Sequence, residues 1–421
     1  MSIWKKAACL LMIVAVILCI TMSFSAQEQI TLSVLYEYTS ESGRDAIQQS
    51  LEQYQKENPH IKLDIQVATQ ARWPELMRMR AVANDYPDIS TCVPQRVSEW
   101  ALAGKLAPGN DIIPKVVLNK YDEARMLSVI HNDGQIYGLP FTDAIRAVAY
   151  NVDYFKKAGI TPPQKAEDAW TWEELVEAAK KAQAASGAKY ALQFEKASFD
   201  GWLSFIYQAG AELMNEDYTE STVKTPEFRR ALEWTVKLHE EEIAAPGIIE
   251  GIEDPVRTFA SGLTTMWLAT GHWMMDALDP QMQCEYAYTF LPKDVQQATV
   301  VGGTDWVVFE GPHSKEAWDL LLYMVSSGPM ASFNQAVTSV PPRSDVKVDW
   351  RIHPEFATLF AEQARQMPEN LLIHQLHPAY GACRDKLLQE LSACVSGQKS
   401  VDRTLDAMDR IMQDALKTHQ Y

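Results

Sequence analysis

Blocks of alternating and helically spaced apolar residues follow one another from residue 30 onward. Residues 30–36 are rich in branched apolar side chains, as in a strand, and residues 42–58 have apolar positions at helical spacing. After a proline, residues 61–65 alternate like a second strand. This order predicts a β-α-β unit in a parallel sheet, whose strand ends face a crevice. Tyr36 and Glu37 come where the first strand ends, so we expect them at that crevice.

The stretch 134–160 contains two short apolar runs separated by polar residues. The first run ends at Pro140 and the second covers 147–150, with Asp143 between them. We predict two short strands here, because proline removes a donor from a strand ladder. A short helix should follow Asn151.

The rest of the chain continues the alternation of strands and helices. Thr171 begins a capping box at the start of one helix, and a glycine interrupts the long C-terminal apolar pattern at 396–397. The predicted elements are helices over 73–84, 172–185, 226–242, 314–326 and 380–416 (broken at 396–397), and strands near 86–90, 192–194 and 300–308.

The N-terminus has the layout of a secretory signal peptide. Two lysines precede an apolar run from Ala7 to Ile20, and small residues follow as far as Ala26. We predict removal of residues 1–26 and a periplasmic or extracellular location. A retained membrane anchor is the alternative reading, because the apolar run nearly suffices to span a bilayer. Lipoprotein anchoring is disfavoured, since the large Leu18 precedes Cys19.

Size, charge and cysteine content limit the classes of function. A chain of 421 residues is too long for one core, so two lobes are expected. A formal charge of −17 argues against nucleic acid as a partner. Four cysteines follow the signal segment, and their spacing matches no metal pattern. We expect mostly buried free thiols, although export permits disulfides.

An ordered series of short motifs resembles the family 1 extracellular solute-binding proteins, the maltose-binding-protein-like group. No single motif is specific, but their order and separations are. The motifs are Pro87-Asp88-Ile89, the segment Asn151-Val152-Asp153-Tyr154-Phe155-Lys156-Lys157-Ala158-Gly159 followed by Trp170-Thr171-Trp172, then Phe259-Ala260-Ser261-Gly262, Gly271-His272-Trp273, Gly302-Gly303 and Val340-Pro341-Pro342-Arg343.

The resemblance implies a two-lobed α/β fold of the periplasmic-binding-protein type (type II) with a three-segment hinge. The chain would cross between lobes near 142–147, 301–305 and 341–348. Residues 27–143 and 305–345 would form the N-terminal lobe. Residues 144–304 and 346–421 would form the C-terminal lobe.

Candidate ligand contacts fall at strand ends, crossings and family motifs. Aromatic rings offer flat apolar faces to sugars, whereas carboxylates, amides and guanidinium groups bind hydroxyls. Core packing is the alternative for each ring, and a solvated loop position is the alternative for each polar residue. The candidates are Tyr36, Glu37, Gln95, Asp143, Phe199, Trp202, Trp273, Asp305, Trp306 and Arg343.

One departure from the family bears on the ligand. At the position where the resemblance places a ligand-contacting glutamate, this chain has Ala144. Asp143 is the neighbouring carboxylate that could replace it. Maltodextrin is therefore a poor expectation for the solute.

The sequence favours a binding protein over an enzyme. No nucleophile elbow, phosphate-binding loop or metalloprotease motif is present. We predict the solute-binding component of an ABC importer, a monomer that binds a carbohydrate and delivers it to membrane permease subunits, with no cofactor and no metal. The alternatives are a secreted glycoside hydrolase, whose two carboxylates the 55 acidic residues could supply, and a binder of another solute such as a glycerol phosphodiester or a polyamine.

Overall fold

The computed structural model describes residues 29–38, 40–69, 72–131, 133–195 and 198–419. The predicted signal segment, 1–26, lies outside the described residues. The strands are β1 (Ile30–Tyr38), β2 (Ile61–Thr69), β3 (Ile89–Cys92), β4 (Gly138–Asn151), β5 (Tyr190–Gln193), β6 (Thr264–Gly271), β7 (Tyr286–Thr289) and β8 (Val301–Val308).

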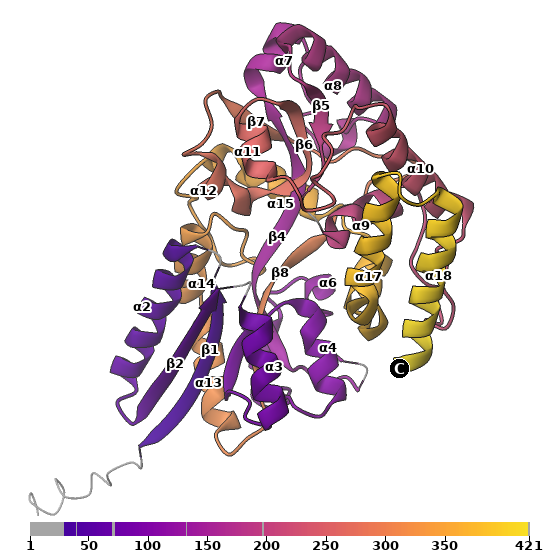
Figure 1. The fold of residues 1–421 in the computed structure, drawn as a ribbon. Helices are drawn as coiled ribbons and strands as arrows, with labels where there is room; N and C mark the ends of the chain where they lie inside the picture. Colours follow the sequence, from indigo (N-terminus) through magenta and orange to yellow (C-terminus); the bar gives the residue numbers. More distant parts are fainter. Residues whose placement is uncertain (1–28, 39, 70–71, 132, 196–197, 420–421) are drawn as a thin grey trace, which may run out of the picture.

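Helices surround these strands in both halves of the molecule (Figure 1). The helices of the first half and its return segment are α2 (Glu41–Glu57), α3 (Trp73–Ala83), α4 (Pro94–Leu102), α5 (Lys115–Leu118), α6 (Glu123–Met126), α13 (Ser314–Met324) and α14 (Ser327–Ala336). Those of the second half are α7 (Val152–Ala158), α8 (Trp172–Ser186), α9 (Phe199–Gln208), α10 (Pro226–Glu240), α11 (Pro255–Ala260), α12 (Met275–Leu278), α15 (Ala357–Ala364), α16 (Glu369–Leu376), α17 (Pro378–Val395) and α18 (Val401–Thr418).

The strands form one continuous sheet in the order β2-β1-β3-β8-β4-β6-β5, with β7 also paired to β4. The predicted β-α-β unit is confirmed, because β1 and β2 pair in parallel from Ile30↔Ile61 to Tyr38↔Thr69. The long strands β4 and β8 run antiparallel to each other and join the two halves (Figure 1). These two strands lie at the centre of the molecule, where its two halves meet (Figure 1).

The prediction of two short strands around Pro140 is wrong. A single strand, β4, runs for 14 residues from Gly138 to Asn151. Its register against β8 shifts between Pro140 and Thr142, and this irregularity accommodates a residue that has no N–H to donate. The polar residues between the apolar runs are therefore part of a strand that both halves share.

The apolar core is divided into separate clusters on either side of this crossing. One cluster draws on residues 32–141 and 306–346, and it includes Trp306. A second cluster, around Trp202, draws on residues 148–300 and 371–416, and a third joins 145–149 to 256–301 and 350–360. The chain therefore forms two lobes, each with its own core, and the N-terminal lobe is completed by a late segment.

A third crossing follows α14. The backbone N–H of Asp143 donates to the carbonyl of Val340 at 3.0 Å. Val346 then packs in the N-terminal core, and Trp350 packs in the cluster around Phe360 beyond the crossing. This segment connects the lobes a third time, close to the predicted 341–348.

Several local predictions are confirmed. Thr171 and Glu174 form a reciprocal capping box at the start of α8. The short helix predicted after Asn151 is α7, and it ends at Gly159, whose φ of +68° glycine adopts without strain. All four described cysteines are unpaired, and three of them are buried. Within the described ranges, no helix combines the length and apolar character needed to cross a membrane.

Candidate functional site

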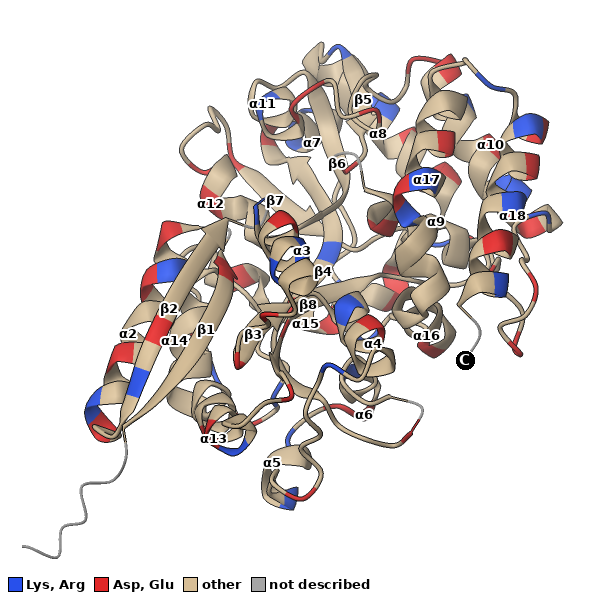
Figure 2. Ribbon diagram, turned by 60° about the horizontal axis from the view of Figure 1, so that its bottom comes forward, with Lys and Arg blue, Asp and Glu red and all other residues tan. Residues whose placement is uncertain are grey.

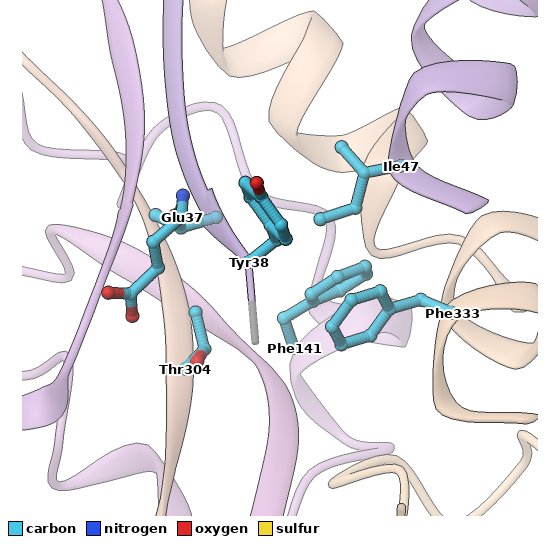
Figure 3. A pocket seen from close by; sticks show the side chains of 7 residues that line it. Glu37, Tyr38, Ile47, Phe141, Thr304 and Phe333 are labelled. Carbon is cyan, nitrogen blue, oxygen red and sulfur yellow. Dashed lines mark hydrogen bonds between the residues drawn. The ribbon is translucent and has the colours of Figure 1, made fainter. Parts of the chain in front are cut away.

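A pocket lies in the N-terminal lobe where β1 and β3 end beside the crossing. One side is polar and the other is apolar (Figure 3). The lining residues are Glu37, Tyr38, Ile47, Thr91, Phe141, Thr304 and Phe333. In Figure 3 the Glu37 carboxylate points away from the Phe141 and Phe333 rings.

Glu37 is the charged group of this pocket. It is 8% exposed, and its backbone N–H donates to Thr91 Oγ1 at 2.9 Å. One of its carboxylate oxygens, Oε1, is buried with no hydrogen-bond partner in the described structure. Burial disfavours the charged form and raises the pKa of Glu37 to about 7. Because Oε1 has no partner, the carboxylate retains the capacity to accept a hydrogen bond.

A buried arginine holds the carboxylates of the two crossing strands. Arg125, beside β4 in the N-terminal lobe, donates to Asp143 Oδ1 and to Asp305 Oδ1, each at 2.6 Å. It also donates to Ser128 Oγ and to the carbonyl of Thr142. Burial raises the pKa of both aspartates, and the Arg125 guanidinium opposes that shift. This cluster ties β4 to β8 where they leave the N-terminal lobe.

The two glycines of β8 occupy different surroundings. Gly303 has φ +144°, and a Cβ there would lie 2.0 Å from the carbonyl oxygen of Thr142. At Gly302 the nearest atoms would be those of Ala144, at 3.8 Å. Gly303 is therefore required by close strand packing, whereas Gly302 has room around it.

The C-terminal wall of the crossing carries a second charged group. Arg146 Nε donates to Glu195 Oε2 at 2.8 Å, and the Arg146 guanidinium carbon lies 5.6 Å from the Trp273 ring centroid. Asp200 accepts hydrogen bonds from Tyr380 Oη at 2.5 Å and from Arg384 at 3.3 Å. Trp273 is partly exposed, so its ring remains accessible at this wall.

The structure brings only part of the predicted ligand set to these walls. Glu37 lines the pocket of the N-terminal lobe, and Trp273 lies beside Arg146 on the C-terminal side of the crossing. Gln95 is half-buried in the first turn of α4. Asp143 and Asp305 lie at the crossing, bound by Arg125.

The other predicted ligand residues make internal contacts. Trp202 is 3% exposed, and its indole N–H donates to Thr235 Oγ1 at 2.8 Å. Arg343 pairs with Asp345 and donates to the carbonyl of Val325. Phe199, Trp306 and Tyr36 are fully buried in the cores. This placement gives no support to ligand contact by these five residues, whose prediction remains untested.

Sequence reasoning did not select Arg125 or Glu195, although both pair with residues at the crossing. Arg125 is 18 residues from Asp143 and 180 from Asp305, so no local pattern joins the three. Arg146 carried a signal, since it stands among the polar residues between the two apolar runs. No group of three or more metal-binding side chains occurs in the part of the chain that the structure describes.

Residues 39–331 match the family model described as bacterial extracellular solute-binding protein. The lactose-binding protein of Rhizobium radiobacter is 28% identical over 197 residues, which cover 45% of this chain and 45% of that relative. The chain thus aligns with less than half of that relative's length. The multiple sugar-binding protein of Streptococcus mutans is 23% identical over 74% of each chain.

Two solved structures show the same fold. The GacH receptor of Streptomyces glaucescens, determined unliganded and with acarbose, has a TM-score of 0.78 at 19% identity, covering 93% of this chain and 100% of that one. An ABC substrate-binding protein from Listeria monocytogenes, in complex with cycloalternan, has a TM-score of 0.78 at 18% identity with the same coverage. Both likenesses support the two-lobed α/β architecture.

Proposed function

Because this chain belongs to the bacterial extracellular solute-binding protein family, we propose that it captures a carbohydrate between its lobes for an ABC importer. The observation that carries the proposal is the pair of walls at the crossing. In the N-terminal lobe Glu37 has a carboxylate oxygen without a hydrogen-bond partner among the described residues, and in the C-terminal lobe the Trp273 ring is partly exposed beside Arg146. A carbohydrate needs both an acceptor for its hydroxyls and an aromatic face.

The lobes are assigned as 27–143 with 305–345 and 144–304 with 346–421. The separate cores and the three connections support this division, except that Val346 still packs in the N-terminal core. Ligand capture proceeds by lobe closure, because a solute that touches both walls favours the arrangement in which they approach. Gly302, with room around it, is the bending point.

The arrangement of the lobes also bears on closure. Helix α4 of the N-terminal lobe lies against α17 (Figure 1) and against α16, both of which belong to the C-terminal lobe. These contacts close one side of the crossing, and opening the lobes would separate them. Gln95 lies in the first turn of this helix, so its position relative to the C-terminal lobe depends on the closure.

Delivery requires a membrane partner and a location outside the cytoplasm. We assign the permease subunits of an ABC importer as that partner, and export by the N-terminal segment as the route. The protein acts as a monomer, binds no nucleic acid and performs no reaction on the sugar. The family relatives are binding proteins, which supports the last statement.

A thermal-shift screen against a sugar library tests this function. A true ligand at a hundredfold excess over its dissociation constant should stabilise the protein by about 2.7 kcal/mol. The same ligand should reduce the radius of gyration in small-angle scattering and should be recovered intact after incubation. A cleaved sugar, or stabilisation without compaction, would favour a hydrolase with a rigid pocket.

A further inference from the structure

The carboxylates around the crossing differ in whether a cation accompanies them. Arg125 forms ion pairs with Asp143 and Asp305, and Arg146 forms an ion pair with Glu195. Arg384 likewise contacts Asp200. Glu37 has no ion pair within the described ranges, although it is 8% exposed. It is the exception among these buried or half-buried acids.

An uncompensated buried carboxylate is unfavourable unless it gains a proton or a cation. The hydroxyls of Thr91 and Thr304 beside Glu37 carry no charge and cannot neutralise it. The oxygen Oε1 is buried and accepts no hydrogen bond from the described residues, so its capacity to accept one is unused in this structure. Its raised pKa, about 7, is consistent with this lack of a counter-charge.

Two kinds of ligand group could donate to Glu37. A sugar hydroxyl supplies a hydrogen bond but leaves the negative charge uncompensated. A protonated amine supplies both the hydrogen bond and the charge, and such charge-assisted bonds are about twice as strong as neutral ones. An amine is therefore the better chemical complement to this pocket.

Resting on the proposed function, we propose that Glu37 selects a saccharide that carries a protonated amino group. The solute is then an amino sugar or an oligosaccharide that contains one. The polar side of the pocket holds the amine, and the partly exposed rings of Tyr38 and Phe333 on its apolar side face the ring of the sugar (Figure 3).

The surrounding charge favours such a ligand at long range. The chain carries a formal charge of −17, which attracts cations more than neutral solutes. Figure 2 shows basic and acidic residues side by side on the outer helices α10, α17 and α18, so the helices beyond the crossing present no single-sign basic face that would repel an amine.

Isothermal titration calorimetry at pH 7 with matched saccharides tests the proposal. The probes are a glucosamine disaccharide, cellobiose with hydroxyls in place of the amines, di-N-acetylchitobiose with neutral amides, and a wider panel of mono- and oligosaccharides with their amino counterparts. We expect an amine-bearing member to bind at least about tenfold tighter than its neutral counterpart, a change of about 1.4 kcal/mol.

The variant Glu37→Gln keeps the size of the side chain and removes its charge, so it should abolish the amine preference. Glu57→Gln is the matched control. Glu57 is exposed at the end of α2, near the starts of β1 and β2 and remote from the crossing. The Glu57→Gln variant should prefer amine-bearing sugars as strongly as the unaltered protein does. Thermal denaturation should show that both variants are folded.

The outcomes separate this inference from the proposed function. Neutral sugars that bind as tightly as their amino counterparts would overturn the inference and leave sugar binding intact. An amine preference that persists in Glu37→Gln would also overturn it, because another residue would then be responsible. Failure of every saccharide to bind would contradict both proposals.

Discussion

Asp305 and Glu37 are buried carboxylates that each leave one oxygen without a hydrogen-bond partner in the described structure, but only Asp305 is paired with a cation. Both are buried beside β3. In the sheet, Cys92 of β3 lies opposite Asp305 of β8, and Thr91 Oγ1 accepts a hydrogen bond from the backbone N–H of Glu37. Asp305 is fully buried and accepts a hydrogen bond from Arg125 at 2.6 Å. Glu37 has no such partner in the described structure.

This difference shows that burial alone does not identify a ligand residue. An acid that is already paired contributes to the architecture, because its charge is satisfied by the protein. An acid that is buried without a partner lowers the stability of the empty protein and is the better candidate for ligand binding. The following predictions test that distinction.

Removing the arginine of the paired side should have the largest effect. Arg125→Ala leaves two buried carboxylates without a counter-charge and should lower the free energy of unfolding by about 3 to 5 kcal/mol. Urea denaturation measures this change. The control is Arg229→Ala, which removes an exposed arginine that also contacts two carboxylates and should change stability by less than about 1 kcal/mol. Equal losses in the two variants would contradict a structural role for the Arg125 cluster.

The close packing around Arg125 predicts unequal effects at the two glycines of β8. Gly303→Ala should lower the free energy of unfolding by about 3 kcal/mol, because its Cβ would clash with the Thr142 carbonyl at a strained φ. Gly302→Ala should have a much smaller effect, since its nearest neighbour is 3.8 Å away. Thermal or urea denaturation of the pair decides the matter. A Gly303→Ala variant as stable as Gly302→Ala would show that the strands can separate there.

Removal of the charge of Glu37, the carboxylate without an ion pair in the described structure, should stabilise the protein. The pKa of Glu37 is raised from 4.5 to about 7, so the folded state binds more protons between these pH values, and stability falls as pH rises through that window. Glu37→Gln lacks this fall and should be more stable than the unaltered protein by about 2 to 3 kcal/mol at pH 8, with the gain vanishing below about pH 4.5. Urea denaturation at pH 4 and pH 8 measures both. A Gln variant that is less stable at pH 8 would imply an internal partner for Glu37.

The smallest expected effect concerns Trp273, beside Arg146 on the C-terminal side of the crossing. Trp273→Ala should weaken binding of the sugar found in the screen by about 1 to 3 kcal/mol, the scale of one buried aromatic contact. The fold should persist because Trp273 is partly exposed. Trp202→Ala is the contrasting variant, since it empties a core position and should reduce stability instead. Unchanged affinity of Trp273→Ala in calorimetry would remove this ring from the proposed site.

The sequence predicted local structure well where its signals are local. Thr171 and Glu174 lie three residues apart, so their capping box was visible without the fold. Pro140 misled the strand prediction, because the register shift that accommodates it depends on β8, a segment far away in the sequence. The family resemblance supplied the two-lobed architecture, which periodicity alone could not determine.

The site was only partly predictable for the same reason. Glu37 could be placed at a strand end from the pattern of β1. The roles of Asp143 and Asp305 depend on Arg125, and no spacing rule connects residues so distant in the chain. Trp202 lies on α9, whose residues are almost all buried, so its ring is used for packing. Whether a residue contacts ligand or packs within the protein depends on partners that are distant in the sequence. Residue type alone does not reveal these partners.

The return of β8 to the N-terminal lobe has a consequence for the order of folding. The N-terminal core needs Trp306 and the helices that follow it, so it cannot close until most of the chain has been synthesised. Contacts between such distant segments slow folding, because the intervening chain must first be ordered. We expect a chain that ends at residue 300 to leave β3 and β4 without their shared neighbour and to be digested rapidly over residues 30–150 in limited proteolysis. A protease-resistant N-terminal fragment would show that this lobe matures independently of its last segment.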